Sequence, residues 1–299
     1  MSFGRKRYRY RSGHHGLEGE ILIIAIASGK GGTGKTTIAV NFALSINNVQ
    51  ILDVDVEEPN ANVFLNIDLT EKKEVNMVVP TIDETTCTFC GACSRFCAYH
   101  ALAVVPNKVL VFPELCHSCK GCALVCPVDA VKWEKRSIGV VYKGTAEGIL
   151  FIQGELNVGE AMATPVIRAV KREIDQSRTV IIDAPPGTSC PMIEAIKGVD
   201  YVILVTEPTP FGLNDLTLAV DVVRTQNIPF GVIINQEDIG DRKVDIYCQK
   251  EHIPILLRIP HDKRIASYYS NGEAFVKHMP NFKKGFEQLF ARIKKEYVQ

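Results

Sequence analysis

The sequence has no hydrophobic run long enough to cross a membrane. A spanning helix needs about 20 consecutive apolar residues, and no stretch of the chain approaches that length. The first residues also lack the apolar core of a secretory signal peptide. These absences argue against a transmembrane protein and against export, so we expect a globular protein of the cytoplasm.

An excess of charge of either sign is also absent. The 34 Lys and Arg residues balance 34 Asp and Glu residues, so the chain has no global positive field to attract nucleic acid or an anionic membrane. Residues 1–20 are locally basic and include Tyr8 and Tyr10, which could stack on nucleic acid. A flexible basic tail is the simpler interpretation, since chain termini are commonly solvated. We expect neither a nucleic-acid nor a membrane partner.

Short β-branched runs alternate with amphipathic segments along most of the chain. The runs are typical of buried parallel strands, and they are residues 21–27, 49–54, 179–183, 201–206, 230–235 and 253–259. Apolar residues recur at helical spacing in residues 36–45, 165–174, 213–225 and 242–251. Repeated strand–helix units predict an α/β fold with a doubly wound, mostly parallel sheet.

A cysteine-rich segment interrupts this alternation once. Eight of the ten cysteines lie between Cys87 and Cys126. Such crowding in a reducing compartment indicates metal binding rather than disulfides. We expect a small domain, residues 75–133, to be inserted into an α/β domain that comprises residues 21–74 and 134–299.

A glycine-rich loop follows the first predicted strand. It matches G-x-x-x-x-G-K-[ST] in the strand–loop–helix context of a phosphate-binding loop, and its residues are Gly29, Lys30, Gly31, Gly32, Thr33, Gly34, Lys35 and Thr36. Backbone N–H groups of such a loop surround phosphate oxygens at a helix N-terminus. We expect Lys35 to reach the β and γ phosphates, Thr36 to offer its hydroxyl to Mg²⁺, and Thr37 to donate to the α phosphate.

The same loop also fits the fingerprint of a dinucleotide site. Gly29, Gly31 and Gly34 spell G-x-G-x-x-G, and Asp53 lies at about the separation expected of a ribose-binding acid. A dinucleotide site has no use for Lys35 followed by two threonines, nor for the acid Asp183 that ends a later strand. These residues favour the phosphate loop of a nucleotide-hydrolysing protein.

With Lys30 as an additional lysine, the loop resembles the deviant Walker A motif of MinD and ParA ATPases. That family includes nitrogenase iron protein and the Mrp-type cluster carriers, and the resemblance covers most of the chain after Glu20 outside the cysteine segment. It implies binding of ATP and ADP, hydrolysis of ATP, and a homodimer that forms with ATP. In such a dimer Lys30 would contact the nucleotide of the second copy, whereas the alternative is a lysine that faces solvent.

The resemblance also implies roles for residues at the ends of predicted strands. By the family pattern, Asp55 is the catalytic acid that orients water, acting with the two loop lysines, and Asp53 supports the Mg²⁺ shell. Asp183, which ends the Walker B segment, would hold a metal-bound water. Asn235 matches the residue that reads adenine, and Pro260 would lie beside the base.

The crowded cysteines form two runs of identical spacing. The pattern C-x2-C-x2-C-x3-C begins at Cys87 and again twenty-nine residues later at Cys116. It resembles two-cluster bacterial ferredoxins, in which the last cysteine of each run ligates the other [4Fe–4S] cluster. That implies one cluster on Cys87, Cys90, Cys93 and Cys126 and a second on Cys97, Cys116, Cys119 and Cys122. Zinc is the alternative, but zinc has no use for the x3 step or for the duplication.

Two further cysteines and the C-terminal segment lie outside these motifs. Cys190 follows Asp183 by seven residues, near where nitrogenase iron protein has a cluster cysteine. It is either a buried structural thiol or an interface thiol facing its counterpart in a second copy. Cys248, in a predicted helix, is expected in the core. Residues 282–297 form an amphipathic helix, which we expect to dock on the sheet rather than on a membrane.

The combined motifs predict an ATPase that carries iron–sulfur clusters. We expect ATP binding to close a dimer and hydrolysis to change contacts, so that electrons or a metallocluster pass to a client protein. Stable ligation by four thiolates per cluster favours electron transfer. One alternative is an ATP-dependent switch that chooses location or partner, with structural or redox-sensing clusters. A nicotinamide oxidoreductase would follow only from a dinucleotide site.

Overall fold

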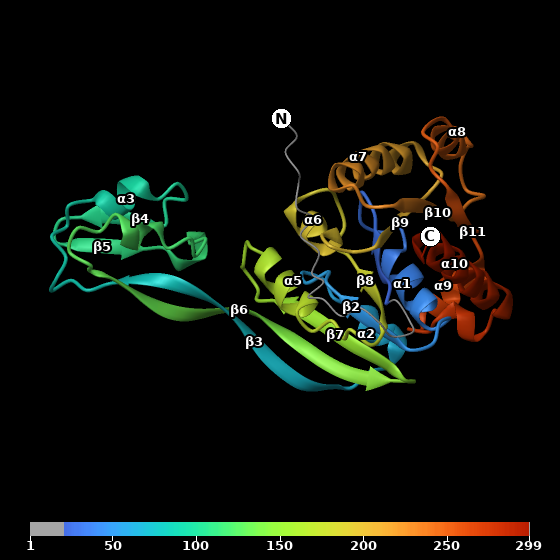
Figure 1. Cartoon of the computed structure of the whole chain (residues 1–299), viewed down its shortest axis with the longest axis horizontal. Coiled ribbons are helices and arrows are strands. Elements are labelled where there is room, and N and C mark those ends of the chain that lie inside the picture. Colours follow the sequence, from blue (N-terminus) through green and yellow to red (C-terminus); the bar gives the residue numbers. More distant parts are fainter. Residues whose placement is uncertain (1–20, 299) are drawn as a thin grey trace.

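The computed structural model describes residues 21–298, and the predicted basic tail, residues 1–20, lies outside them. A nine-stranded sheet with the order β11-β10-β9-β1-β8-β2-β7-β6-β3 forms the centre of the chain (Figure 1). The six strands predicted from the sequence are all present and parallel. They are β1 (Ile23–Ala27), β2 (Val49–Asp53), β8 (Thr179–Asp183), β9 (Tyr201–Thr206), β10 (Phe230–Asn235) and β11 (Ile255–Ile259).

Helices cover both faces of this sheet, which confirms the doubly wound α/β arrangement. Alternate residues of β1 point to opposite faces: Ala25 and Ala27 join one core, and Ile24 and Ile26 join the other. The first core is covered by α5 (Thr164–Lys171), α6 (Cys190–Ile196), α7 (Pro210–Gln226) and α8 (Lys243–Lys250). The second is covered by α1 (Lys35–Ala43), α2 (Ala61–Leu65), η2 (Phe275–Lys277) and α10 (Pro280–Val298).

The C-terminal helix α10 docks on the sheet, as its amphipathic pattern predicted. Phe286, Leu289 and Ile293 are buried in the second core. The ring of Phe286 stacks on Phe42 of α1 with 5.7 Å between centroids. Truncating such a fully buried ring to alanine costs about 3–5 kcal/mol, so this contact fixes α10 firmly. None of the helices in the described part of the chain is long and apolar enough to span a membrane.

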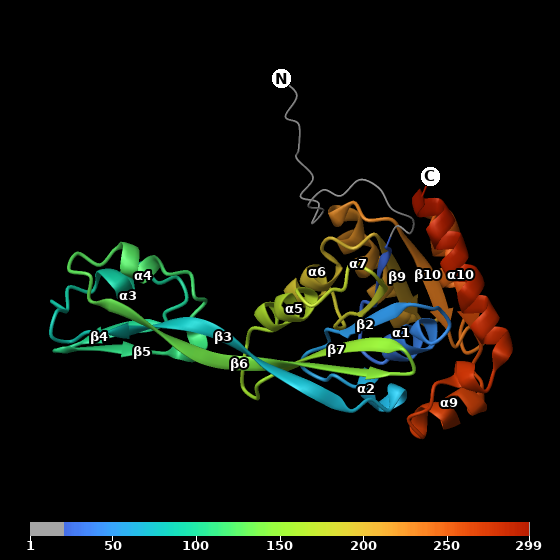
Figure 2. The same ribbon diagram turned by 60° about the horizontal axis from the view of Figure 1, so that its bottom comes forward.

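The sheet has an antiparallel extension that the sequence did not predict. β7 (Ile149–Leu156) pairs parallel with β2, and then β6 (Val131–Ala146) and β3 (Leu69–Ile82) continue as antiparallel neighbours. β3 and β6 are longer than the other strands and leave the sheet together as a two-stranded ribbon (Figures 1 and 2). A register shift at Val75 and Asn76, opposite Gly139 and Ser137, marks the place where the ribbon passes beyond β7.

The cysteine segment forms a separate lobe at the far end of this ribbon (Figure 2). The lobe contains α3 (Ala92–Phe96), β4 (Leu102–Val105), β5 (Lys108–Val111), the 3-10 helix η1 (Pro113–Leu115) and α4 (Gly121–Leu124). It has a small core of its own, in which Leu102, Val109 and Val131 pack against cysteines. The expected boundaries of the inserted domain, residues 75 and 133, fall inside β3 and β6, so the ribbon belongs to both parts of the chain.

Candidate nucleotide site and cysteine lobe

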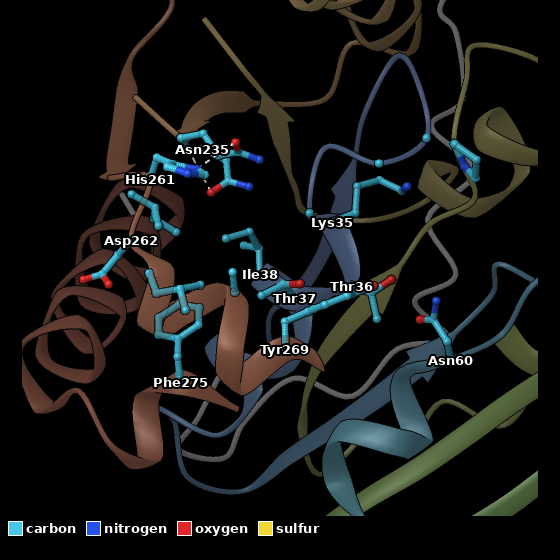
Figure 3. Close-up of a pocket in the computed structure, with 18 of the residues that line it drawn as sticks. Lys35, Thr36, Thr37, Ile38, Asn60, Asn235, His261, Asp262, Tyr269 and Phe275 are labelled. Carbon is cyan, nitrogen blue, oxygen red and sulfur yellow. Dashed lines mark hydrogen bonds between the residues drawn. The ribbon is translucent and has the colours of Figure 1, made fainter. Parts of the chain in front are cut away.

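A cavity of about 480 Å³ opens at the carboxyl ends of the parallel strands. Ligands of open α/β sheets bind at this edge. Figure 3 shows Thr36 and Thr37 of α1 beside it, with Asn235 and His261 at one end and Asn60 at the other. The expected site residues that line the cavity are Gly31, Gly32, Gly34, Lys35, Thr36, Thr37, Asp55, Asn235 and Pro260. Gly29, Lys30, Thr33, Asp53 and Asp183 are not part of its lining.

The phosphate loop has the backbone that its glycines predict. Gly32 and Gly34 have φ angles of +78° and +88°, which favour glycine. A Cβ on Gly29 would come within 2.0 Å of the backbone oxygen of Asp215, so only glycine fits there. Gly34 precedes the first residue of α1, buried Lys35, and has no side chain to cap the helix. The N–H groups and the positive end of α1 therefore face the cavity, as an anion site requires.

Asp183 has the environment of a group that awaits a cation. It ends β8, it is fully buried, and within the described residues neither carboxylate oxygen has a partner at good hydrogen-bond geometry, although the hydroxyl of Thr36 lies close enough to lower the pKa of this group. Burial raises the pKa of Asp183 to about 6, although the ammonium of Lys35 and the hydroxyl of Thr36 lower it. A buried carboxylate without a partner is costly unless a cation compensates it. Together with the hydroxyl of Thr36 at the cavity, these oxygens fit Mg²⁺ held partly through water.

Asp55 lies in the cavity wall on the loop that follows β2. Burial raises the pKa of Asp55 to about 7; the charge of Lys35 opposes this, and the carboxylate of Asp183 adds to it. A carboxyl group with a pKa near neutrality can hold or release a proton of a reacting water. The position and the pKa both suit the expected role of Asp55 in orienting water.

Asp53 lies outside the cavity and stabilises the loop that follows β2 by accepting hydrogen bonds from its backbone. Its Oδ1 accepts the N–H of Asp55 at 3.1 Å, and its Oδ2 accepts the N–H groups of Asn60 and Ala61, both at 3.0 Å. Burial and the carboxylate of Asp183 raise the pKa of Asp53, against these backbone donors. Asp53 therefore fixes Asp55 and the start of α2, so any support it gives to Mg²⁺ passes through the loop.

The other end of the cavity is suited to a nucleotide base. The side-chain amide of Asn235, at the end of β10, donates to the carbonyl of Thr33 at 2.9 Å and so connects this end to the phosphate loop. Pro260 follows β11 in the same wall. Several residues that sequence reasoning missed complete this end, and they are Gln236, Ile259, His261, Asp262, Ile265, Ala266, Tyr269 and Phe275. Of these, Gln236, His261 and Asp262 could have been found, since they follow the strands that end near Asn235 and Pro260.

Lys30 is held away from the cavity by an acid of its own chain. Its ammonium lies 3.7 Å from Oε2 of Glu207, the residue after β9. The side chain of Lys30 is 32% exposed, and that of Glu207 is 13% exposed. In the single chain Lys30 is thus partly exposed beside Glu207, and its contact with the nucleotide of a second copy stays a prediction.

The lobe brings the eight crowded cysteines together in two sets. Two neighbouring hollows separate them: one is lined by Cys87, Cys90, Cys93 and Cys126, and the other by Cys97, Cys116, Cys119 and Cys122. The fourth cysteine of each run thus joins the first three of the other run. Among the described residues, no three His, Cys, Asp or Glu side chains form a group that could hold a single metal ion.

The backbone around the two runs repeats with the sequence. Left-handed residues recur twenty-nine positions apart: Phe89 with Ser118, Gly91 with Lys120, and His100 with Asp129. Donors to sulfur recur in the same way, from the N–H groups of Phe89 to Cys87, Ser118 to Cys116, Ala101 to Cys97, and Ala130 to Cys126, at 3.3–3.4 Å. N–H donors to ligand sulfur are one of the means by which proteins set cluster potentials.

The two remaining cysteines differ in exposure. Cys248 is buried in the first core, as expected. Cys190 is the first residue of α6 and is exposed. The expectation of a buried structural thiol at Cys190 is therefore wrong, because the turn before α6 places this residue at the surface. An interface thiol remains a prediction.

The comparison with known families agrees with this geometry. Residues 24–275 match the CobQ/CobB/MinD/ParA nucleotide binding domain. The chain belongs to this family. The chain has an α/β P-loop fold with a mostly parallel sheet, which counts against the dinucleotide interpretation of the glycine-rich loop.

Relatives and structural neighbours cover most of the chain. It is 33% identical over 266 residues to an uncharacterized protein of Methanocaldococcus jannaschii, covering 87% of this chain and 93% of that protein. It is 25% identical over 270 residues to the iron-sulfur cluster carrier protein of Pyrococcus horikoshii, covering 80% and 74% of the two chains. The structure of septum site-determining protein MinD with Mg-ADP from Pyrococcus horikoshii aligns with a TM-score of 0.55 at 20% identity, covering 90% and 94%. That likeness shows the fold.

Proposed function

We propose that this protein is an ATP-binding and ATP-hydrolysing iron–sulfur protein of the cytoplasm that couples its nucleotide state to a client protein. The observation that carries the proposal is the presence, in one chain, of the nucleotide cavity and of a lobe with eight cysteines in two sets of four. The similarity to an iron-sulfur cluster carrier protein of Pyrococcus horikoshii supports the iron–sulfur part of the proposal.

The nucleotide site supports ATP and Mg²⁺ as ligands. The phosphate loop and the start of α1 would bind the phosphates, Thr36 and Asp183 would hold Mg²⁺, and Asn235 and Pro260 would contact the base. Mg²⁺ would supply neutralisation of the charge that develops on the phosphates. Asp55 would orient the attacking water, Lys35 would neutralise charge, and Lys30 would contact the nucleotide of a second copy in an ATP-dependent homodimer.

The cysteine lobe supports two [4Fe–4S] clusters rather than zinc. A two-cluster ferredoxin needs the fourth cysteine of each run at the other cluster, and the two hollows divide the cysteines in this way. Ligation by four cysteines makes such clusters hard to donate and favours electron transfer over cluster delivery.

The chain path supports coupling between the two sites. The loop that holds Asp55 leads through α2 directly into β3, and β3 runs to the lobe. On the return path β6 is tied to the nucleotide domain, since Arg136 forms a two-contact ion pair with Glu160 and Ser137 accepts from Asn157 at 3.1 Å. A change at Asp55 when the γ phosphate leaves would act at the base of the ribbon.

One experiment tests the proposal and separates its two forms. The anaerobically purified protein is reduced and mixed with Mg-ATP and a cluster-free acceptor protein or an electron acceptor. ATP hydrolysis, the iron content of the protein and the reoxidation of its clusters are followed in each sample. Electron transfer predicts reoxidation with the iron retained, whereas metallocluster assembly predicts loss of iron to a cluster-free acceptor. Absence of stoichiometric iron, or absence of ATP hydrolysis, would contradict the proposal.

A further inference from the structure

The ion pair of Lys30 lies within a short series of polar contacts. Oε2 of Glu207 faces the ammonium of Lys30 at 3.7 Å, and Oε1 of Glu207 accepts from the side-chain amide of Gln236 at 3.1 Å. Both oxygens of this largely buried carboxylate are therefore in use. The hydroxyl of Ser28 donates to the carbonyl of Lys30 at 2.5 Å, which also fixes the backbone at Lys30.

The same contacts continue into the base end of the nucleotide cavity. Oε1 of Gln236 lies 3.2 Å from Nδ1 of His261, and both residues line the cavity. Gln236 has a φ of +52° directly after Asn235, whose Oδ1 accepts the N–H of Gln236 at 3.1 Å. Gln236 thus has one side-chain contact toward the base and one toward Glu207. A base in this cavity and the ammonium of Lys30 are separated by two side chains.

We propose that Glu207 is a positioning residue that holds Lys30 on its own chain in competition with the nucleotide of a second copy. The proposal rests on the proposed function, in which Lys30 contacts that nucleotide in the ATP-bound dimer. The lysine ammonium is a compact charge, and it cannot remain beside Glu207 while it reaches a phosphate of another chain. Each dimer must therefore break two such ion pairs, one from each copy.

Gln236 connects the contact between Glu207 and Lys30 to the base end of the cavity, because it donates to Glu207 and also lines the cavity. A base that contacts Gln236 or His261 changes the hydrogen bonds of Gln236, and Gln236 is a neutral partner that orients the Glu207 carboxylate.

The test compares dimerisation of Glu207→Gln with that of a matched control. Both are prepared in the Asp55→Asn background, which is expected to hydrolyse ATP slowly. Glutamine keeps the shape of Glu207 and removes the charge that faces Lys30. The control is Glu237→Gln, which removes a comparable ion pair, with Arg258 at 3.6 Å, outside the cavity. Sedimentation velocity with saturating Mg-ATP gives the protein concentration at which half of the chains are dimeric.

We expect Glu207→Gln to lower this midpoint about two- to thirtyfold, because each dimer breaks two partly exposed ion pairs that contribute about 1.4- to fivefold each, and Glu237→Gln to leave it unchanged. In a Lys30→Ala background, where dimers should form only at higher protein concentration, Glu207→Gln should not move the midpoint further, because the competing ammonium is absent. An unchanged midpoint for Glu207→Gln in a parent that dimerises would overturn the proposal. An equal shift in the Lys30→Ala background would also overturn it.

A second measurement separates failure of this inference from failure of the proposed function. Reductive methylation of the nucleotide-free monomer, read by mass spectrometry, reports the access of reagent to Lys30 without a dimer. We expect faster methylation of Lys30 in Glu207→Gln and, to a smaller extent, in Gln236→Leu. If Lys30 is methylated faster in Glu207→Gln but the parent protein never dimerises with ATP, the contact between Glu207 and Lys30 is supported and the ATP-dependent dimer is refuted. Unchanged methylation of Lys30 in Glu207→Gln would refute the proposal that Glu207 positions Lys30.

Discussion

Asp53 and Asp183 occupy paired positions on the neighbouring parallel strands β2 and β8, yet their carboxylates have opposite environments. Asp53 accepts three backbone N–H groups, whereas Asp183, in the described part of the chain, accepts none of good geometry and has only the nearby hydroxyl of Thr36. The carboxylate of Asp53 stabilises the fold through these hydrogen bonds. That of Asp183 is left for a ligand, at a cost to stability.

The burial of the Asp183 carboxylate predicts how the free energy of unfolding depends on pH. The folded-state pKa values of Asp183 and Asp55, about 6 and about 7, lie above the unfolded value of 3.8. Between pH 4 and 7 the folded chain therefore binds more protons than the unfolded chain, so the free energy of unfolding falls as the pH rises through this window. Asp183→Asn should flatten the dependence and stabilise the nucleotide-free protein at pH 8 by about 1–3 kcal/mol. Urea unfolding at several pH values, without Mg²⁺, measures both; an Asp183→Asn variant less stable than the parent would contradict the account.

The supporting role of Asp53 predicts a different failure. Asp53→Ala leaves the N–H groups of Asp55, Asn60 and Ala61 without their acceptor, and a buried donor left without a partner costs about 1–3 kcal/mol. The variant should lose stability and show faster hydrogen exchange in the loop that holds Asp55. Asp183→Asn is the matched control, and it should lose Mg²⁺-dependent nucleotide binding without faster exchange in that loop. Equal exchange in both variants would remove the distinction drawn between these acids.

The two loop lysines should fail differently when changed. Lys35 is buried at the start of α1, so Lys35→Ala should abolish ATP binding to the monomer. Lys30 lies outside the cavity, so Lys30→Ala should leave monomer binding measurable and impair hydrolysis and ATP-dependent dimerisation. Calorimetry with a slowly hydrolysed ATP analogue, together with sedimentation, measures both properties. Equal loss of binding in the two variants would contradict a role for Lys30 at the second copy.

The two sets of cysteines can be tested with paired double variants. The protein should contain about eight irons as two [4Fe–4S] clusters. Cys87→Ser with Cys126→Ser removes two ligands of one cluster, and the other should remain intact. Cys87→Ser with Cys97→Ser removes one ligand from each cluster, so neither should retain four thiolates. Iron analysis and electron paramagnetic resonance of the reduced proteins compare them. An intact-cluster signal of equal size in both would refute the exchange of fourth cysteines between runs, and stoichiometric zinc would refute the clusters.

The parallel part of the fold could be predicted because its sequence patterns are compatible with few other structures. Strands such as β8, Thr179–Asp183, are short β-branched runs buried on both faces, and Lys35 and Thr36 follow a loop whose pattern has few other uses. The ribbon could not be predicted in this way. Most of β3 before Val75 is polar and exposed, so it has no hydrophobic period, and its place is set by pairing with β6.

The site shows the same division. Asn235 and Pro260 could be placed because they end strands of a recognisable motif. Tyr269 and Phe275 belong to α9 (Lys263–Ser270) and η2, and they reach the cavity only through the packing of the C-terminal segment. The contact between Lys30 and Glu207 joins two loops that are far apart in sequence. Such contacts depend on strand order, which short motifs do not record.

The central claim, that nucleotide state and cluster state are coupled, is tested most directly by redox titration followed by electron paramagnetic resonance. The protein is compared without nucleotide, with Mg-ADP, with Mg-ATP, and as Asp55→Asn with Mg-ATP. We predict a cluster signal or potential that changes with Mg-ATP and persists in Asp55→Asn, which should keep both clusters and remain a closed dimer. Cys190→Ser should alter this response without lowering the iron content of the lobe. Identical signals and potentials in all four states would contradict the coupling and would favour a nucleotide-dependent switch whose clusters are structural.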